Sequence, residues 1–179
     1  MSMRRLIVAA LAVLALPMAA LAQERMTGPV FNGFGSWTPI ESTQEVPKDQ
    51  HYRAIFDSSK GATPGELNGR IDSAARYINL LVAAGVPREN IEVAIVVHGS
   101  ASWDVVTDAA YARKYPGQAN GSAKAIAEMV ASGVEFYICG QAAAHHGIAN
   151  ADLLPGVTMS LSQTVATSIL HNRGFQEIP

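Results

Sequence analysis

The chain has 179 residues, of which 49% are hydrophobic and 16% are charged, and its formal net charge is -2 at pH 7. A chain of this size holds one domain with a hydrophobic core of its own, so a second domain is not expected. The near-neutral charge provides no basic field for DNA or RNA, and we expect no nucleic-acid partner.

Residues 1–22 have the pattern of a secretory signal peptide. Arg4 and Arg5 precede an apolar run over residues 6–16, and small residues follow it up to Ala22, after which we expect cleavage. A permanent membrane anchor is the alternative, but this run is shorter than the roughly twenty residues that span a bilayer. The sequence therefore predicts a soluble periplasmic protein with no membrane association after signal cleavage.

Residues 23–50 combine glycine and proline with aromatic side chains. Glycine and proline interrupt helix and strand alike, whereas the aromatic side chains need an apolar surface to cover them. The composition predicts an extended N-terminal arm that lies across the domain or across a neighbouring subunit.

Residues 51–179 alternate between strand and helix patterns. The β-branched run 91–97 is typical of a central strand covered on both faces, and apolar residues at helical spacing predict a helix over 66–84. Because parallel strands need long crossovers, the alternation predicts a three-layer αβα fold with a mostly parallel sheet of about five strands. In chain order, the predicted strands are 52–56, 91–97, 134–138, 157–160 and 175–178, and the predicted helices are 66–84, 102–114, 122–132, 141–146 and 162–172.

Polar or reactive residues follow four of the predicted strands. In open parallel sheets, ligands bind outside the carboxyl ends of the strands, so one edge of this sheet is predicted to carry the functional site. The segments at that edge are Asp57-Ser58-Ser59, His98-Gly99, Cys139-Gly140-Gln141 and Ser160-Leu161-Ser162.

Cys139 is the only cysteine of the chain. Structural cysteines of exported proteins usually come in pairs, and a single one cannot form an intramolecular disulfide. It is therefore buried and inert, bonded to another molecule, or kept for its reactivity. Its position at a strand end, just before a predicted helix, favours a reactive thiolate. The alternative is a cysteine that caps the sheet core with no exposed sulfur.

Four further residues are candidates for the same site. His98, at the neighbouring strand end, can take a proton from the thiol or orient a substrate, although a histidine hydrogen-bonded into a turn is an equal alternative. Gly140 lets a substrate approach closely, and the Gln141 side chain can donate a hydrogen bond to a bound anion or persulfide. We assign catalysis to Cys139 and His98, and substrate binding to Gly99, Gly140 and Gln141.

His145 and His146 suggest a copper or zinc site with Cys139 as a further ligand. No second cysteine and no standard ligand spacing supports such a site, and adjacent histidines point to different sides of a helix. We expect neither a metal nor another cofactor, since phosphate-loop, dinucleotide-binding and Cys-x-x-Cys motifs are missing from the sequence as well. Asp57 and Ser58 are interpreted as ordinary turn residues.

Six short segments in chain order give the chain a resemblance to a known family: Tyr52 to Phe56, Val96 to Gly99, Phe136 to Gln141, Leu153 to Val157, Met159-Ser160 and Gly174-Phe175. Residues 51–179 resemble the exported branch of the DsrE/DsrF-like family of sulfur-relay proteins. The resemblance implies a compact α/β domain that assembles as a homotrimer or a hexamer. In cytoplasmic sulfur-oxidising members, a cysteine at this strand end carries a persulfide and passes sulfur to a partner protein, and Cys139 matches it.

Three functions are compatible with these observations. The leading hypothesis is a periplasmic sulfur carrier, similar to a sulfurtransferase, that receives sulfane sulfur from a donor, holds it as a persulfide on Cys139 and yields it to an acceptor. The second is a non-catalytic module that binds a small ligand or a transition metal between the strand ends and His145 or His146. The third is an oligomeric scaffold in which Cys139 is buried.

Overall fold

A computed structural model describes residues 24–179, and the predicted signal peptide lies outside the described residues. Its five-stranded sheet has the order β4-β3-β2-β1-β5, and every pair of neighbouring strands is parallel. The strands are β1 (Tyr52–Ser58), β2 (Ile91–Val97), β3 (Glu135–Cys139), β4 (Val157–Ser160) and β5 (Gln176–Ile178). The helices are α1 (Gly69–Ala83), α2 (Asp108–Lys114), α3 (Ala123–Ala131), α4 (Gly140–His146) and α5 (Gln163–Asn172), with 3₁₀ helices η1 (Arg88–Asn90), η2 (Gly99–Val105) and η3 (Asn150–Asp152).

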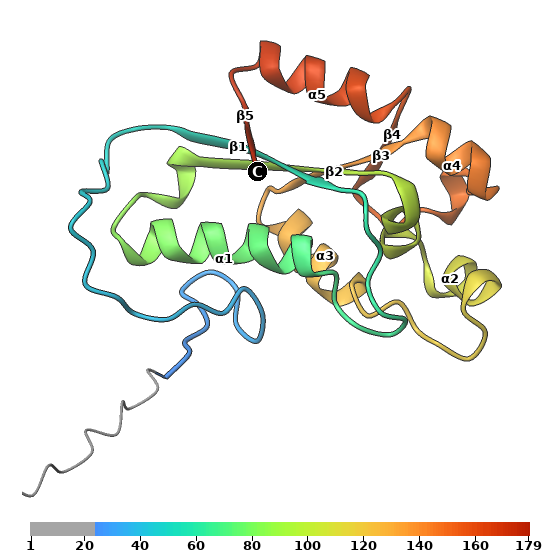
Figure 1. Cartoon of the computed structure of the whole chain (residues 1–179), viewed down its shortest axis with the longest axis horizontal. Helices are drawn as coiled ribbons and strands as arrows, with labels where there is room; N and C mark the ends of the chain where they lie inside the picture. Colours follow the sequence, from blue (N-terminus) through green and yellow to red (C-terminus); the bar gives the residue numbers. More distant parts are fainter. Residues whose placement is uncertain (1–23) are drawn as a thin grey trace, which may run out of the picture.

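Helices cover both faces of the sheet. Helices α1 and α3 lie on one face and α5 lies on the other (Figure 1). Because successive side chains of a strand point to opposite faces, neighbouring residues enter different cores. Val97 and Ile138 belong to the larger core on the side of α1 and α3, whereas Val96 belongs to the smaller core under α5. The predicted α/β fold with a parallel sheet is therefore confirmed.

The α5 layer is fastened at its carboxyl-terminal end. Leu170 is buried against the sheet, and the Arg173 guanidinium donates two hydrogen bonds of 2.8 and 2.7 Å to the Glu135 carboxylate of β3. These bonds lower the pKa of Glu135, since they favour its charged form. The opposite end of α5 starts at the carboxyl edge of the sheet, where Ser162 caps the helix by accepting a hydrogen bond from the Val165 amide.

One predicted helix is wrong in its first half. Residues 102–105 belong to η2, and the α-helix begins only at Asp108. Between them, Val106 is extended and forms an antiparallel bridge with Leu153, and Thr107 caps the new helix by accepting a hydrogen bond from the Ala110 amide. A backbone that pairs with a distant segment in an extended conformation cannot continue a helix.

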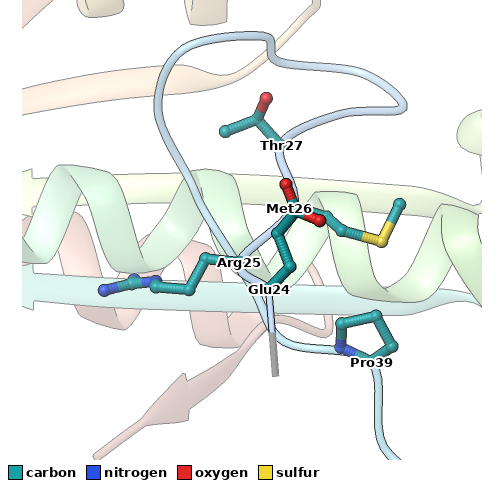
Figure 2. A pocket seen from close by; sticks show the side chains of 5 residues that line it. All are labelled: Glu24, Arg25, Met26, Thr27 and Pro39. Atoms are coloured by element: carbon teal, nitrogen blue, oxygen red, sulfur yellow. The ribbon is translucent and has the colours of Figure 1, made fainter. Parts of the chain in front are cut away.

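Residues 24–50 contain no helix, and one β-bridge, between Met26 and Trp37, joins two parts of the segment. Figure 2 shows the start of this segment, where the Met26 and Pro39 side chains lie on the same side of the crossing chain and the Arg25 side chain points away from both. The first part of the segment lies on the side of α1 that faces away from the sheet, and the rest runs round the end of α1 to β1 (Figure 1).

Asn79 of α1 fixes this segment to the domain. The side chain is fully buried, and its oxygen accepts hydrogen bonds from the Val30 and Phe31 amides at 3.1 and 2.9 Å. Its amide group donates to the Phe31 and Gly35 carbonyls, both at 3.1 Å. One side chain therefore satisfies four backbone groups that no helix or sheet ladder satisfies.

A buried carboxylate joins the loops that follow β1 and β2. Asp104 of η2 is 2% exposed, and its Oδ2 atom accepts hydrogen bonds from Asn68 Nδ2 at 2.6 Å and from the Ala62 amide at 3.1 Å. Asn68 in turn caps α1 by accepting a hydrogen bond from the Arg70 amide. Burial raises the pKa of Asp104 above its usual value of 3.8, because desolvation disfavours the charged form more than these bonds support it.

We predict that Asp104→Asn becomes more stable relative to the wild type as pH rises. The folded-state pKa of Asp104 lies above the unfolded value, so the fold is more stable with Asp104 protonated than with it charged. This contribution to stability is lost as pH rises above about 4. The amide side chain keeps an oxygen acceptor for Asn68 and carries no charge. Urea unfolding at about pH 4 and pH 7 measures the free energy of unfolding of both proteins. The difference, variant minus wild type, should be more positive at pH 7 than at pH 4. The exposed control Asp49→Asn should show no such trend, and a pH-independent difference for Asp104→Asn would contradict the prediction.

Candidate functional site

The register of the central strands sets Cys139 between two polar neighbours. Val97 pairs with Ile138, so His98 follows at the level of Cys139, and on the other side Cys139 itself pairs with Ser160. Ile138 faces the core on the side of α1 and α3, and alternation therefore turns Cys139 toward the α5 face.

Asp57 belongs to the same row. It follows Phe56, which faces the core on the side of α1 and α3, so Asp57 lies on the α5 face near the end of β1. The interpretation of Asp57 and Ser58 as turn residues is wrong, because β1 continues through both and pairs with β2 up to Ser58. The α5 face thus carries Asp57, His98, Cys139 and Ser160 on neighbouring strands at the carboxyl edge.

The Cys139 side chain is nearly covered in the single chain. The residue is 7% exposed and immediately precedes α4. Within residues 24–179, its sulfur forms neither a disulfide nor a hydrogen bond. The thiol is therefore held by packing, and a reagent reaches it only through a small opening or through a local movement of the chain.

His98 and Asp57 form a hydrogen-bonded pair. The distance between His98 Nε2 and Asp57 Oδ2 is 2.9 Å, and the two side chains are 30% and 25% exposed. The other carboxylate oxygen, Oδ1, is buried and has no hydrogen-bond partner within the described part of the chain. Sequence reasoning missed this pair, and the only signal for it was the alternation of Asp57 with Ile55 on one face of the strand.

Gly140 and Gln141 hold the end of β4 against the start of α4. A Cβ atom at position 140 would collide with the Ser160 carbonyl oxygen, so the two strand ends approach each other only because residue 140 is glycine. The Gln141 side-chain amide donates a hydrogen bond of 3.1 Å to the Leu161 carbonyl. Both residues therefore shape the edge beside Cys139, and their roles toward a substrate stay predictions.

Gly99 and His146 join the loops after β2 and β3. Gly99 has a φ of +54°, a left-handed conformation that favours glycine, and its carbonyl accepts a hydrogen bond of 3.0 Å from His146 Nε2. The His146 ring also packs against Trp103 of η2, with ring centroids 5.8 Å apart. In residues 24–179 no group of three or more histidine, cysteine or acidic side chains is placed to hold a metal ion.

An apolar groove adjoins Cys139 on its own face of the sheet. It has a volume of about 220 Å³ and lies between α5 and the last two strands of that edge. Ser160, the register partner of Cys139, lines it, as does Tyr137, which precedes Cys139 by two residues on the same face. We call it the α5 groove, and its lining residues, none of them charged, are Tyr137, Thr158, Ser160, Leu161, Val165, Ala166, Ile169 and Leu170.

The hollow in Figure 2 is a different feature. It has a volume of about 540 Å³ and is lined by Glu24, Arg25, Met26, Thr27 and Pro39. These residues lie beyond α1 and contribute no strand end, so this hollow plays no part in the site at the carboxyl edge.

Comparisons with known proteins agree with the fold and extend it to a family. The model of the DsrE/DsrF-like family matches residues 52–175, a range that includes every candidate site residue. The solved structure of a protein of unknown function, MTH1491 from Methanobacterium thermoautotrophicum, is similar with a TM-score of 0.51 at 17% sequence identity. The match covers 71% of this chain and 97% of that one, and it concerns the fold. No curated protein matches the chain.

No helix within residues 24–179 has the length and apolar character needed to cross a membrane.

We predict that Gly140→Ala destabilises the fold by roughly 1–3 kcal/mol, because the new methyl group meets backbone that cannot move aside without separating β3 from β4. Gly69→Ala is a matched control, since Gly69 is likewise the first residue of a helix but a Cβ atom there meets no other atom within 4 Å. Urea unfolding of both variants tests this. Equal stability of the two would show that the contact between Gly140 and Ser160 does not constrain the edge.

Proposed function

The chain belongs to the DsrE/DsrF-like family, and on that basis we propose that it is a periplasmic carrier of sulfane sulfur with Cys139 as the acceptor. The observation that carries this proposal is the row of side chains on the α5 face, in which the only cysteine lies beside a histidine at the carboxyl edge of a parallel sheet. The periplasmic location rests on the pattern of residues 1–22.

The transfer proposed for Cys139 is an exchange between sulfur atoms. The Cys139 thiolate attacks the terminal sulfur of a donor persulfide, R–S–SH; a bond forms between the two sulfur atoms while the bond between that sulfur and R–S breaks. The departing thiolate takes up the proton released by Cys139. The products are the Cys139 persulfide and R–SH, with no net oxidation or reduction, and a reversal of these steps yields the sulfur to an acceptor thiol.

Intact-mass measurement tests this function directly. We predict that the purified protein gains the mass of one sulfur atom after incubation with an inorganic polysulfide, and that dithiothreitol removes it. Cys139→Ser should gain nothing, because the chain contains no other thiol. A native protein that stays unmodified under conditions in which a free cysteine peptide is sulfurated would rule the proposal out.

An oligomeric scaffold is the second candidate, and the 7% exposure of Cys139 favours it. The two functions differ in the rate at which iodoacetamide alkylates the folded protein. In a carrier, the alkylation rate of the folded protein should lie within about tenfold of the rate of the urea-unfolded chain. A structural cysteine is alkylated only when the fold opens, so its rate should be lower than that of the unfolded chain by about 100-fold or more.

A second copy of the chain is the partner that we propose for the α5 groove. Leu161, Val165 and Ile169 are 76%, 38% and 56% exposed at its rim, and β4 is an edge strand with one side of its backbone unpaired. The lining carries no charge that would oppose a like surface. Self-association through this face is consistent with the expected trimer or hexamer and would also cover the region beside Cys139.

Light scattering coupled to gel filtration tests the assembly. We predict that Ile169→Glu lowers the oligomer to smaller species, because it places a charge in the apolar contact. Ser168→Glu is the control, since Ser168 is the adjacent exposed residue of α5 and lies outside the groove lining. A wild-type protein that is monomeric at micromolar concentration, or an oligomer that Ile169→Glu leaves intact, would refute self-association through this face.

A further inference from the structure

We propose that Asp57 is a positioning residue that holds His98 as the proton acceptor of Cys139. The proposal rests on the function above, in which Cys139 is the reacting group, and assigns the proton transfer to named atoms. Its basis is the single row on the α5 face, where β1 supplies the carboxylate, the end of β2 the imidazole and β3 the thiol.

The bond between the two side chains selects one tautomer of the imidazole. A carboxylate only accepts hydrogen bonds, so at 2.9 Å from Asp57 Oδ2 the His98 Nε2 atom carries the hydrogen. In the neutral ring, the lone pair then resides on Nδ1. Asp57 therefore leaves Nδ1 free to accept a proton, and a base for Cys139 requires such a free nitrogen atom.

His98 is the main hydrogen-bond donor to the Asp57 carboxylate. One oxygen binds the imidazole, and the other is buried without a partner among residues 24–179. A carboxylate that is partly removed from water and poorly supplied with donors gains most when its neighbour becomes positively charged. A proton arriving on His98 turns the neutral hydrogen bond into an ion pair, so Asp57 stabilises the state that follows deprotonation of the thiol.

The register of β2 and β3 places His98 and Cys139 at one level of the sheet. They follow a register pair on adjacent strands, which lie about 4.8 Å apart, and both side chains are on the α5 face. No hydrogen bond joins them in the described structure, so the proton passes through one bridging water while Nε2 keeps its hydrogen bond to Asp57. The thiol proton moves to Nδ1, the thiolate attacks the donor, and the imidazolium returns the proton to the departing R–S⁻.

The experiment compares Asp57→Ala, Asp57→Asn and the exposed control Asp49→Ala in the full-length mature protein. The first readout is the rate at which Cys139 reacts with iodoacetamide and, separately, with polysulfide. We expect Asp57→Ala to lower both rates by about tenfold or more, and Asp57→Asn to restore part of the loss because its amide oxygen still accepts from Nε2. Asp49→Ala should react like the wild type.

The second readout is the tautomer of His98, taken from NMR of the imidazole nitrogens. We expect the Nε2–H form in the wild type and in Asp57→Asn, and a mixture in Asp57→Ala. Wild-type protein with the hydrogen on Nδ1 overturns the proposal even if Asp57→Ala fails to fold, and so does Asp57→Ala with unchanged rates.

The two proposals fail in different ways. If the protein accepts no sulfur from polysulfide but Asp57→Ala slows its alkylation, the carrier function is refuted and the role of Asp57 is supported. If the protein is sulfurated equally fast with and without the Asp57 carboxylate, the carrier function is supported and the role of Asp57 is refuted.

Discussion

Parallel pairing of β2 with its neighbours is the constraint on which the site depends. Because Val97 pairs with Ile138, the residues that follow, His98 and Cys139, share one level and one face of the sheet. A register shift of one residue in β3 would turn Cys139 into the core on the side of α1 and α3. Gly140, which has no side chain, would then take its place at the edge. Phe136 and Ile138 of β3 are buried in the larger core, whereas Glu135 and Tyr137 on the opposite face are only half-buried, and a shift would exchange the two sets. Core packing therefore determines where the chemistry lies.

Sequence periodicity identified the strands, the α/β class and the edge that carries Cys139, because each depends on patterns local to the chain. It failed where distant pairing decides the structure. Val106 interrupts a helical pattern by bridging to Leu153, and Asp57 stays in a strand because β2 continues beside it. The buried Asp104 network was likewise not predictable, because Asp104 falls in the predicted helix 102–114 and its partners Asn68 and Ala62 come from a distant loop.

The burial of Cys139 and its proposed chemistry place opposite demands on α5. An apolar cover protects a sulfane sulfur from water and stray thiols, yet a donor must reach the same atom. The two ends of the helix are held differently. Arg173 and Glu135 fix the carboxyl-terminal end through two charged hydrogen bonds. At the amino-terminal end Leu161 and Val165 are exposed, and the hydrogen bonds, from Gln141 to the Leu161 carbonyl and from the Val165 amide to Ser162, are uncharged. Local opening is therefore expected at the end where access is needed.

A single thiol also limits how a persulfide on this chain can be released. With no second cysteine to attack it, the outer sulfur of a Cys139 persulfide leaves only when a thiol from another molecule arrives. At 7% exposure that thiol must be small, or must belong to a partner whose docking moves the first turn of α5. Because a second copy of the chain is the proposed occupant of the α5 groove, such a partner reaches Cys139 only when the copies separate. Assembly and sulfur transfer to a protein partner then become mutually exclusive states of one surface.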